Sequence, residues 1–477
     1  MLKLIRIHGW ALLALISCAP LAQAQGTGPA KPESGEQPVA PYTPPLPAGS
    51  TSLLALGTSG EVQGPPDDRP LSGVQQQTLG PNSGASNFLA PSFSAMSQLA
   101  TNSFGPGSGG PTDFNYLLGT LDLNRASDRS ELLVHYTGGG MFSSYFNSAI
   151  QDLEFSYNFK WQRWSLLVGD GVSYLSESPF GFGGVGGLDF LSGNSPFGPG
   201  GFLSSILGPN QTIPTIMVPR VSNTAISQIE YKLSPRASWT ASGSYATLDF
   251  LGVGYINSAE ALFQTGYNYS LNPRSSIAVI YRFDDFRFTQ LPQVIENHVV
   301  QLGYERNVTG RLNWHVAAGP SVVMLRGALT GYGNQVSWAL DAALDYKMNR
   351  TTILLSYDHL VTGGGGVLVG AQTGLVQATI DRKLSPRWQG SASLGYATSG
   401  SLIPLSANLA NERLSSWYAV ARLDHQFRPG TAFFVSYEAQ LQAVNTGACT
   451  TPNCGTNTIT HEISVGFNFG LRPISMR

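Results

Sequence analysis

Acidic side chains are the residues of this chain whose placement most clearly suggests a chemical role. They recur at alternate positions of extended segments, on the polar face, and share it with Lys232, Arg282 and Arg422. This pattern predicts a water-filled surface that contacts small solutes with a mild preference for cations. Alternatively, the charges hydrate a polar face and some pair with one another, as Arg422 can with Asp424. The acidic positions are Asp152, Glu154, Glu230, Glu260, Asp284, Glu305, Asp341, Asp345, Asp358, Asp424, Glu438 and Glu462.

The seven histidines do not form a recognisable catalytic pattern. His135 and His315 fall on polar faces, but neither has a Ser, Asp or Asn at a spacing typical of a hydrolase. Four others fall on apolar faces, where an imidazole is more typical of a membrane interface than of a general base: His298, His359, His425 and His461. The sequence also has no phosphate-binding loop, EF-hand or haem motif. It therefore predicts no enzyme, no cofactor and no metal site.

Two cysteines, Cys449 and Cys454, are expected in the mature chain, in a long loop and separated by Thr-Thr-Pro-Asn. An exported protein meets an oxidising compartment, where such a pair forms a disulfide. A zinc site would need more ligands nearby. The sequence therefore predicts a disulfide between these two residues.

Long β-strands are the elements that must position these side chains. In Thr431–Ala443 and in Ile459–Leu471, alternate residues are apolar while those between them are mostly polar, which only a strand separates onto two faces. A soluble β-sandwich also alternates, but its strands usually have about five or six residues. These segments have about a dozen, which fits the roughly 9 to 11 residues of a tilted membrane-crossing strand.

The C-terminal strand also carries a family resemblance. Ser464, Gly466, Phe469 and Leu471 have the spacing of a polar residue, a glycine and two apolar or aromatic residues. This resembles the C-terminal assembly signal of bacterial single-chain outer-membrane barrels, although the usual pattern ends on the aromatic residue and this chain continues through residues 472–477. The resemblance implies an outer-membrane location, contact with lipid, and insertion by the barrel-assembly machinery.

Short basic turns mark the expected hairpins. Tyr231–Arg236, Tyr269–Arg274 and Arg382–Arg387 share a Ser-Pro-Arg or Asn-Pro-Arg core. Pro with Asn or Ser favours a tight turn, and a Tyr just before the turn suits the aromatic girdle at a membrane interface. The connections at the other ends of the strands are longer. Short turns on one side and long loops on the other predict periplasmic turns and extracellular loops.

We therefore expect an all-β fold, a transmembrane antiparallel up-and-down barrel over residues 86–471, with 18 strands and 16 as the alternative. An even number with both ends in the periplasm requires a weak first strand within Ser86–Thr101. The other expected strands are 113–124, 130–140, 149–159, 163–174, 221–233, 236–248, 254–270, 275–285, 294–306, 311–324, 335–347, 350–361, 367–382, 387–397, 413–427, 431–444 and 458–471.

The composition agrees with a membrane barrel. Only 12% of the 477 residues are charged, against a typical quarter, while the mean hydropathy is only −0.02. Beyond the N-terminus, the sequence has no apolar run of about 18 residues that would predict a membrane-spanning helix. A net charge of −2 gives no basis for a nucleic-acid partner.

The first 24 residues read as a signal peptide. The apolar run Trp10–Ile16 is followed by Ala22-Gln23-Ala24, an A-x-A cleavage site that would leave Gln25 as the first mature residue. Leu15–Cys18 resembles a lipobox, which would instead leave an acylated Cys18. In both cases the chain leaves the cytoplasm.

Residues 25–85 precede the expected barrel, and their first part is rich in Pro, Gly and Ser. We expect an extended, largely disordered periplasmic linker, either a spacer or a tether that touches peptidoglycan or a periplasmic partner, with no folded plug. Residues 472–477 form a short tail.

One loop, Leu175–Pro219, is far longer than the roughly 12 to 15 residues of ordinary loops. It is rich in Gly and nearly free of charge, so we expect it to fold into the lumen as a constriction or to meet a lipid, ligand or partner; a disordered loop is the alternative. Its aromatic residues are Phe180, Phe182, Phe190, Phe197 and Phe202.

Two functions follow from the sequence. The first is a porin-like outer-membrane channel for passive diffusion of small hydrophilic solutes. The alternative is a surface interaction, scaffold or export-associated barrel with a plugged pore. Conductance in planar bilayers would separate them.

Overall fold

The computed structural model describes most of the chain from residue 70 onward, within the compact unit Pro45–Arg477. The described residues are 70–72, 87–101, 110–145, 147–175, 219–252, 255–289, 291–327, 333–364, 368–403, 413–428, 430–444, 458–471 and 474–476.

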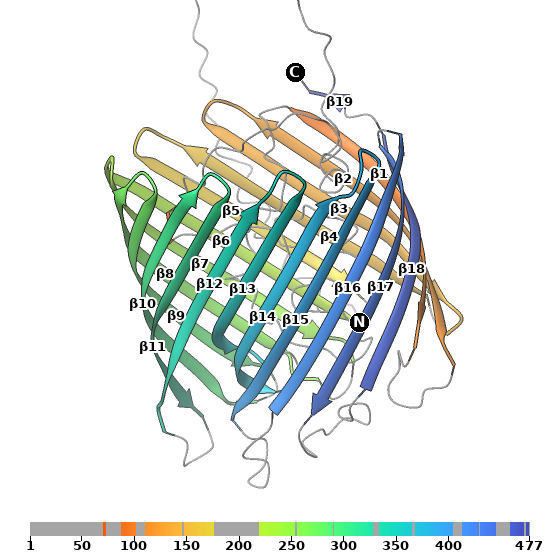
Figure 1. The fold of residues 1–477 in the computed structure, drawn as a ribbon. Helices are drawn as coiled ribbons and strands as arrows, with labels where there is room; N and C mark the ends of the chain where they lie inside the picture. Colours follow the sequence, from red (N-terminus) through yellow and green to blue (C-terminus); the bar gives the residue numbers. More distant parts are fainter. Residues whose placement is uncertain are drawn as a thin grey trace, which may run out of the picture. The chain divides into compact units, whose positions relative to one another are not determined.

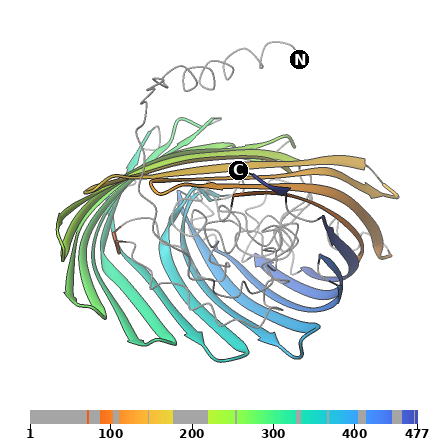
Figure 2. The same cartoon turned by 90° about the horizontal axis from the view of Figure 1, so that it is seen from above.

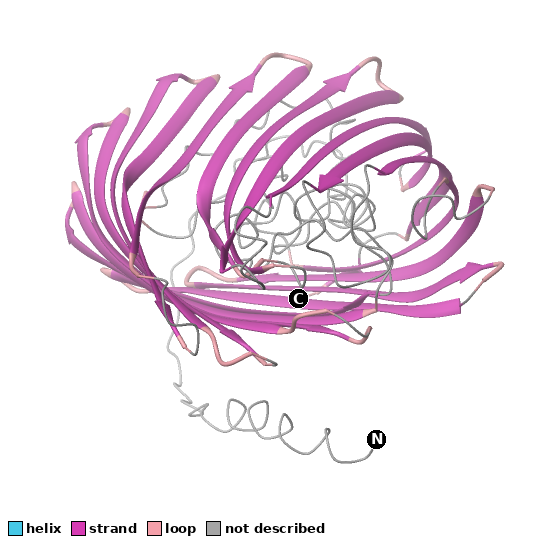
Figure 3. Cartoon of the chain, turned by 90° about the horizontal axis from the view of Figure 1, so that it is seen from below, coloured by secondary structure: helices cyan, strands magenta, loops and turns pink. Residues whose placement is uncertain are grey.

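Strands make up nearly all of the described chain (Figures 1 and 3). Their bounds are β1 Phe88–Ala100, β2 Thr112–Ala126, β3 Ser130–Ser143, β4 Asn147–Lys160, β5 Trp164–Leu175, β6 Arg220–Ser234, β7 Ala237–Phe250, β8 Ser258–Asn272, β9 Ser275–Phe288, β10 Val294–Thr309, β11 Leu312–Arg326, β12 Gln335–Lys347, β13 Thr351–Thr362, β14 Val369–Lys383, β15 Trp388–Ile403, β16 Arg413–Arg428, β17 Thr431–Val444, β18 Thr458–Gly470 and β19 Ile474–Ser475.

The first eighteen strands form one closed antiparallel ring in chain order (Figure 2). The ring closes where β1 pairs with β18, from Ser92 opposite Gly470 to Ala100 opposite Glu462. The expected weak first strand is therefore present, and the prediction of 18 strands is confirmed. Closure satisfies the backbone hydrogen bonds of every strand edge, which a chain must do inside lipid.

The C-terminal tail adds a pairing that the sequence did not predict. Ile474 and Ser475 form the two-residue strand β19, which pairs with Leu89 and Phe88 of β1. The chain thus continues along β1 beyond the position where the assembly signal would usually end.

The turns follow the sequence prediction. Short connections such as Pro235–Arg236, Pro273–Arg274 and Gly310–Arg311 join strands at one rim, and Gly430 in the turn before β17 has a φ of 81° that suits glycine. The end of β18 lies at this rim, because Gly470 N–H donates to Gly430 O at 2.6 Å, and the start of β1 lies there too, because Ser92 is opposite Gly470. The longer connections lie at the other rim.

The alternation separates the two faces of the ring. Side chains of one parity are buried, such as Asp284 and Asn297, while those of the other parity, such as Val279, Leu302 and Leu394, are apolar and exposed. A closed barrel with an apolar exterior spans a membrane, and single-chain barrels of this size are outer-membrane proteins. The protein is therefore an outer-membrane β-barrel.

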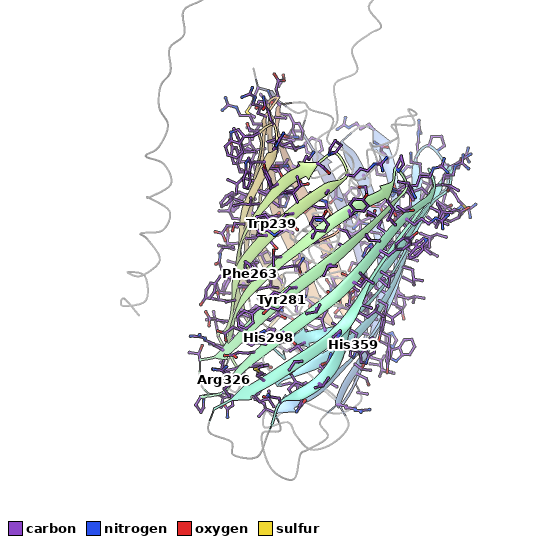
Figure 4. The ribbon with its side chains drawn as sticks, turned by 90° about the vertical axis from the view of Figure 1, so that its left-hand side faces the viewer. Trp239, Phe263, Tyr281, His298, Arg326 and His359 are labelled. Carbon is purple, nitrogen blue, oxygen red and sulfur yellow. The ribbon has the colours of Figure 1, made fainter. Side chains whose placement is uncertain are left out.

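Aromatic side chains gather on the outer face toward both rims. Trp239 and Tyr267 face outward near the short turns, whereas His298 and His359 lie nearer the long loops (Figure 4). Such belts suit the interface between lipid and water. Among the described residues, no helix has the length and apolar character needed to cross a bilayer.

Candidate functional site

The lumenal face carries the candidate site. In the strand register, the predicted acidic residues and Arg282 and Arg422 all fall on the same side of the sheet as the buried positions, which is the inside of the ring. Glu154, Glu260, Asp284, Asp424, Glu438 and Glu462 are at most 5% exposed. The others on this face are partly buried: Asp152, Glu230, Glu305, Asp341, Asp345 and Asp358.

Strands β8 to β13 bring the largest group of these residues together. Arg282 Nε donates to Asp284 Oδ1 at 2.7 Å, and Asn297 Nδ2 donates to Asp284 Oδ2 at 2.9 Å. Glu260 on β8 interacts electrostatically with both Arg282 and Asp284. A single guanidinium therefore lies among several carboxylates, and this wall is acidic overall.

The same group continues onto the next strands. His315 Nε2 lies 2.9 Å from Asp341 Oδ1, and Asp341 is directly opposite Asp358 on β13. Asp358 also interacts electrostatically with Arg282. A cavity in this wall is lined by these side chains together with Gln301 and Ser321. Carboxylates from adjacent strands therefore line this part of the lumenal wall, with Arg282 as the basic side chain among them.

A second group lies on β16 to β18. Arg422 donates from Nε to both carboxylate oxygens of Asp424 at 3.0 Å, and its guanidinium carbon lies 3.9 Å from the centre of the Phe434 ring. The sequence had suggested this pairing as the alternative to a free lumenal charge. Arg422 is therefore held by a bidentate ion pair and an aromatic ring.

Two carboxylates face each other beside this pair. Glu438 and Glu462 are directly opposite on β17 and β18, and Gln98 Nε2 of β1 donates to Glu462 Oε2. Like charges at directly opposite positions repel each other. The acidic character of the lumenal face thus extends to the closing strands.

The third group, on β2 to β4, includes a pairing of His135 that the sequence did not predict. His135 Nδ1 lies 2.6 Å from Asp122 Oδ1, and its Nε2 lies 3.0 Å from Thr137 Oγ1. Asp152 and Glu154 stand opposite Thr137 and His135 on β4. Asp122 was missed because its partner is on the neighbouring strand, thirteen residues away in sequence.

The order hydroxyl, imidazole and carboxylate is also that of a hydrolytic triad. Here, however, Thr137 lies within β3, whose peptide groups pair with β2 on one side and β4 on the other. The neighbouring N–H groups are therefore engaged in the ladders, so they cannot form an oxyanion hole at this hydroxyl. The arrangement stabilises buried polar groups and does not indicate catalysis. Among the described residues, no cluster of three or more His, Cys, Asp or Glu side chains is arranged to hold a metal ion.

The histidines on the outer face have aromatic neighbours. His298 Nδ1 lies 2.9 Å from the Tyr281 hydroxyl, and His359 stacks on Trp338 with 3.8 Å between ring centres. His425 packs at a tilt against Trp388, with 4.4 Å between ring centres, and His461 Nδ1 lies 2.9 Å from the Tyr437 hydroxyl. These side chains belong to the aromatic belts.

An apolar cluster at the long-loop rim was not predicted. Val361, Val369 and Leu402 of β13 to β15 pack against Phe286 and Ile295 of β9 and β10, together with Phe288, Val323 and Ile403. Because Phe286 and Ile295 face the lumen, the ends of β13 to β15 must lean inward to reach them. A Cβ added at Gly370 would overlap Ile295 Cδ1, so the approach is close. This cluster narrows that mouth of the barrel.

Several predicted features lie outside the described residues. They are the signal peptide, most of the linker, the loop aromatics Phe180, Phe182, Phe190, Phe197 and Phe202, and the cysteines Cys449 and Cys454. The loop constriction and the disulfide therefore remain predictions.

The chain resembles known proteins at the level of solved structures. No protein-family model matches the sequence, and no curated protein matches it. The fold is similar to Pseudomonas aeruginosa OpdQ, with a TM-score of 0.43 and 10% identity over 81% of this chain and 99% of that one. It is also similar to P. aeruginosa OccK2 (OpdF), with a TM-score of 0.42 and 11% identity over 81% of this chain and 98% of that one. A BenF-like porin from Pseudomonas fluorescens Pf-5 matches with a TM-score of 0.42 and 9% identity over 80% of this chain and 99% of that one. Similarity at this level assigns neither a family nor a solute to this chain.

Proposed function

We propose that the protein is a channel for passive diffusion of small hydrophilic solutes across the outer membrane, with a mild preference for cations. The supporting observation is the acidic lumenal wall of β8 to β13, where Asp284, Asp341 and Asp358 face the inside of a closed ring. Side chains that line a channel select permeating ions by their charge.

A planar-bilayer recording tests this proposal. The purified full chain should give stepwise conductance, and a salt gradient should give a reversal potential that favours cations. The preference should shrink as the Debye length falls from roughly 30 Å at 0.01 M salt to 3 Å at 1 M. A panel of sugars of increasing size then measures the limiting width. Anionic selectivity, or selectivity that does not change with salt, would contradict the cation preference.

The alternative is a barrel whose pore is plugged and whose loops hold partners. The apolar cluster of Phe286, Ile295 and Leu402 favours it, because this cluster narrows one mouth. Silent bilayers with correctly folded protein would support this function over the channel.

The environment of the barrel forms part of the same proposal. The outer belt contacts outer-membrane lipid, and the barrel-assembly machinery acts on β18 during insertion. Within residues 25–85, the part before Pro70 is either a periplasmic spacer or a tether that contacts peptidoglycan or a partner there.

A further inference from the structure

Residues Pro70–Ser72 lie against the lumenal wall, although they belong to the region that the sequence predicts as a linker. Leu71 and Ser72 are 5% and 1% exposed. Their contacts are with β7 to β11, in the half of the wall nearer the short turns. This short segment therefore occupies a defined place inside the ring.

Polar side chains of the wall hold both the backbone and the hydroxyl of Ser72. Its N–H donates to Asn268 Oδ1 at 2.8 Å, and its carbonyl accepts from Gln264 Nε2 at 2.8 Å. Its hydroxyl accepts from Asn268 Nδ2 at 2.7 Å and also bonds to Thr240 Oγ1. Asn268 and Gln264 thus satisfy the backbone N–H and the backbone carbonyl of Ser72. Hydrogen bonds to the main chain bind a peptide largely independently of its side chains.

An apolar pocket holds the preceding side chain. Leu71 packs against Ala278, Ile280 and Ala317. These are small or branched apolar side chains on a wall that is otherwise polar, so they select an apolar partner.

Two glycines make room for the segment. A Cβ added at Gly303 would lie 2.9 Å from Leu71 Cδ2, and a Cβ added at Gly266 would overlap the Cβ of Ser72. Both the shape of the wall and its side chains therefore match an apolar residue followed by a small residue with a hydroxyl group.

We propose that this wall is a peptide-binding subsite, that Leu71–Ser72 occupies it as an internal ligand, and that short peptides with an apolar residue followed by Ser or Thr compete for it. The proposal deepens the proposed channel function, since it names a class of solute for the same lumen. The charged cavity begins next to it, because Leu71, Gln264 and Ile280 also line that cavity.

Disulfide trapping tests whether the internal ligand is seated as described. In a background with the native cysteines replaced by serine, Ser72→Cys with Thr240→Cys should form a cross-link in the full chain, detected by mass spectrometry. Ser72→Cys with Thr373→Cys is the matched control, because Thr373 is a buried lumenal residue of β14. Equal cross-linking of both pairs, or none for the first, would overturn the internal-ligand part.

Photolabelling tests the peptide class. The probe is acetyl-Pro-photoleucine-Ser-amide, applied to folded full-length protein. The double variant Leu71→Asp, Ser72→Asp should release the internal segment, and labelling of β7 to β9 should then rise severalfold above the wild type. Adding Gly303→Leu should remove the gain, because the new side chain fills the pocket of Leu71. An acetyl-Pro-Glu-Ser-amide competitor should not displace the probe, whereas acetyl-Pro-Leu-Ser-amide should.

These readouts do not depend on conductance. A barrel that conducts no ions but passes both tests would refute the channel and keep the subsite. A conducting barrel whose labelling is the same in wild type and released variant would refute the subsite and keep the channel.

Discussion

Asp122 and His135 face each other across β2 and β3 inside the barrel, with 2.6 Å between Oδ1 and Nδ1, and both side chains are less than one-tenth exposed. A buried carboxylate that loses its partner retains the cost of leaving water. We therefore expect His135→Ala to lower the free energy of unfolding by about 1 to 3 kcal/mol.

The urea midpoint of the refolded barrel, followed by heat-modifiable gel migration, measures this loss. His298→Ala is the matched control, since His298 lies on the outer face, and it should change the midpoint less. Equal effects of the two substitutions would show that the pair with Asp122 contributes little.

The second prediction concerns selectivity. Asp341→Asn with Asp358→Asn removes two lumenal carboxylates that stand directly opposite each other. The cation preference, measured as a reversal potential in low salt, should fall severalfold, and the difference from the wild type should disappear near 1 M salt as screening increases. Asp285→Asn serves as the control, because Asp285 faces outward and pairs with Arg287 at 2.8 Å. A control that changed selectivity as much would place the selective charge elsewhere.

The third prediction concerns topology. Epitope tags inserted within residues 404–412 or after Gly364 should bind antibody on intact cells, because these connections lie at the long-loop rim. Tags at Pro235 or Ser385 lie in short turns and should bind only after the outer membrane is opened. The reverse pattern would invert the orientation of the barrel.

The fourth prediction concerns an acidic residue on the outer face. Asp170 shares the parity of the exposed Trp164 and Val172, so it faces lipid, and Asn223 Nδ2 donates to its Oδ1 at 2.9 Å. A carboxylate on this face is costly. Asp170→Leu should therefore raise the free energy of unfolding by up to about 2 kcal/mol in lipid vesicles. Asp170→Asn, which keeps a polar side chain, should give a smaller gain; a loss for Asp170→Leu would indicate that this patch is covered by protein.

The sequence predicted the ring well because the alternation of polar and apolar residues is repeated in every strand. The first strand, β1, has a weak pattern of its own, and it was predicted because a barrel with both ends in the periplasm needs an even number of strands. The contact of Asp122 with His135 was not predictable because it depends on the exact register of the β2–β3 hairpin, and that of Ser72 with Asn268 because the two residues are far apart in the chain. The mouth cluster around Leu402 was missed for a different reason: strand ends that lean inward break the rule that alternate residues face opposite sides.

The pairing of the two ends of the barrel segment would allow the chain termini to be moved to another turn of the ring. Met476 N–H donates to Asn87 O at 3.1 Å, so the two ends of the barrel segment already meet at the short-turn rim. Every neighbouring pair of strands in the ring, including β1 with β18, is antiparallel and hydrogen-bonded. The pairing of each strand with its two neighbours therefore does not depend on where the chain begins. A circular permutant that joins residues 476 and 87 and begins at Arg236 keeps all eighteen strand pairings of the ring.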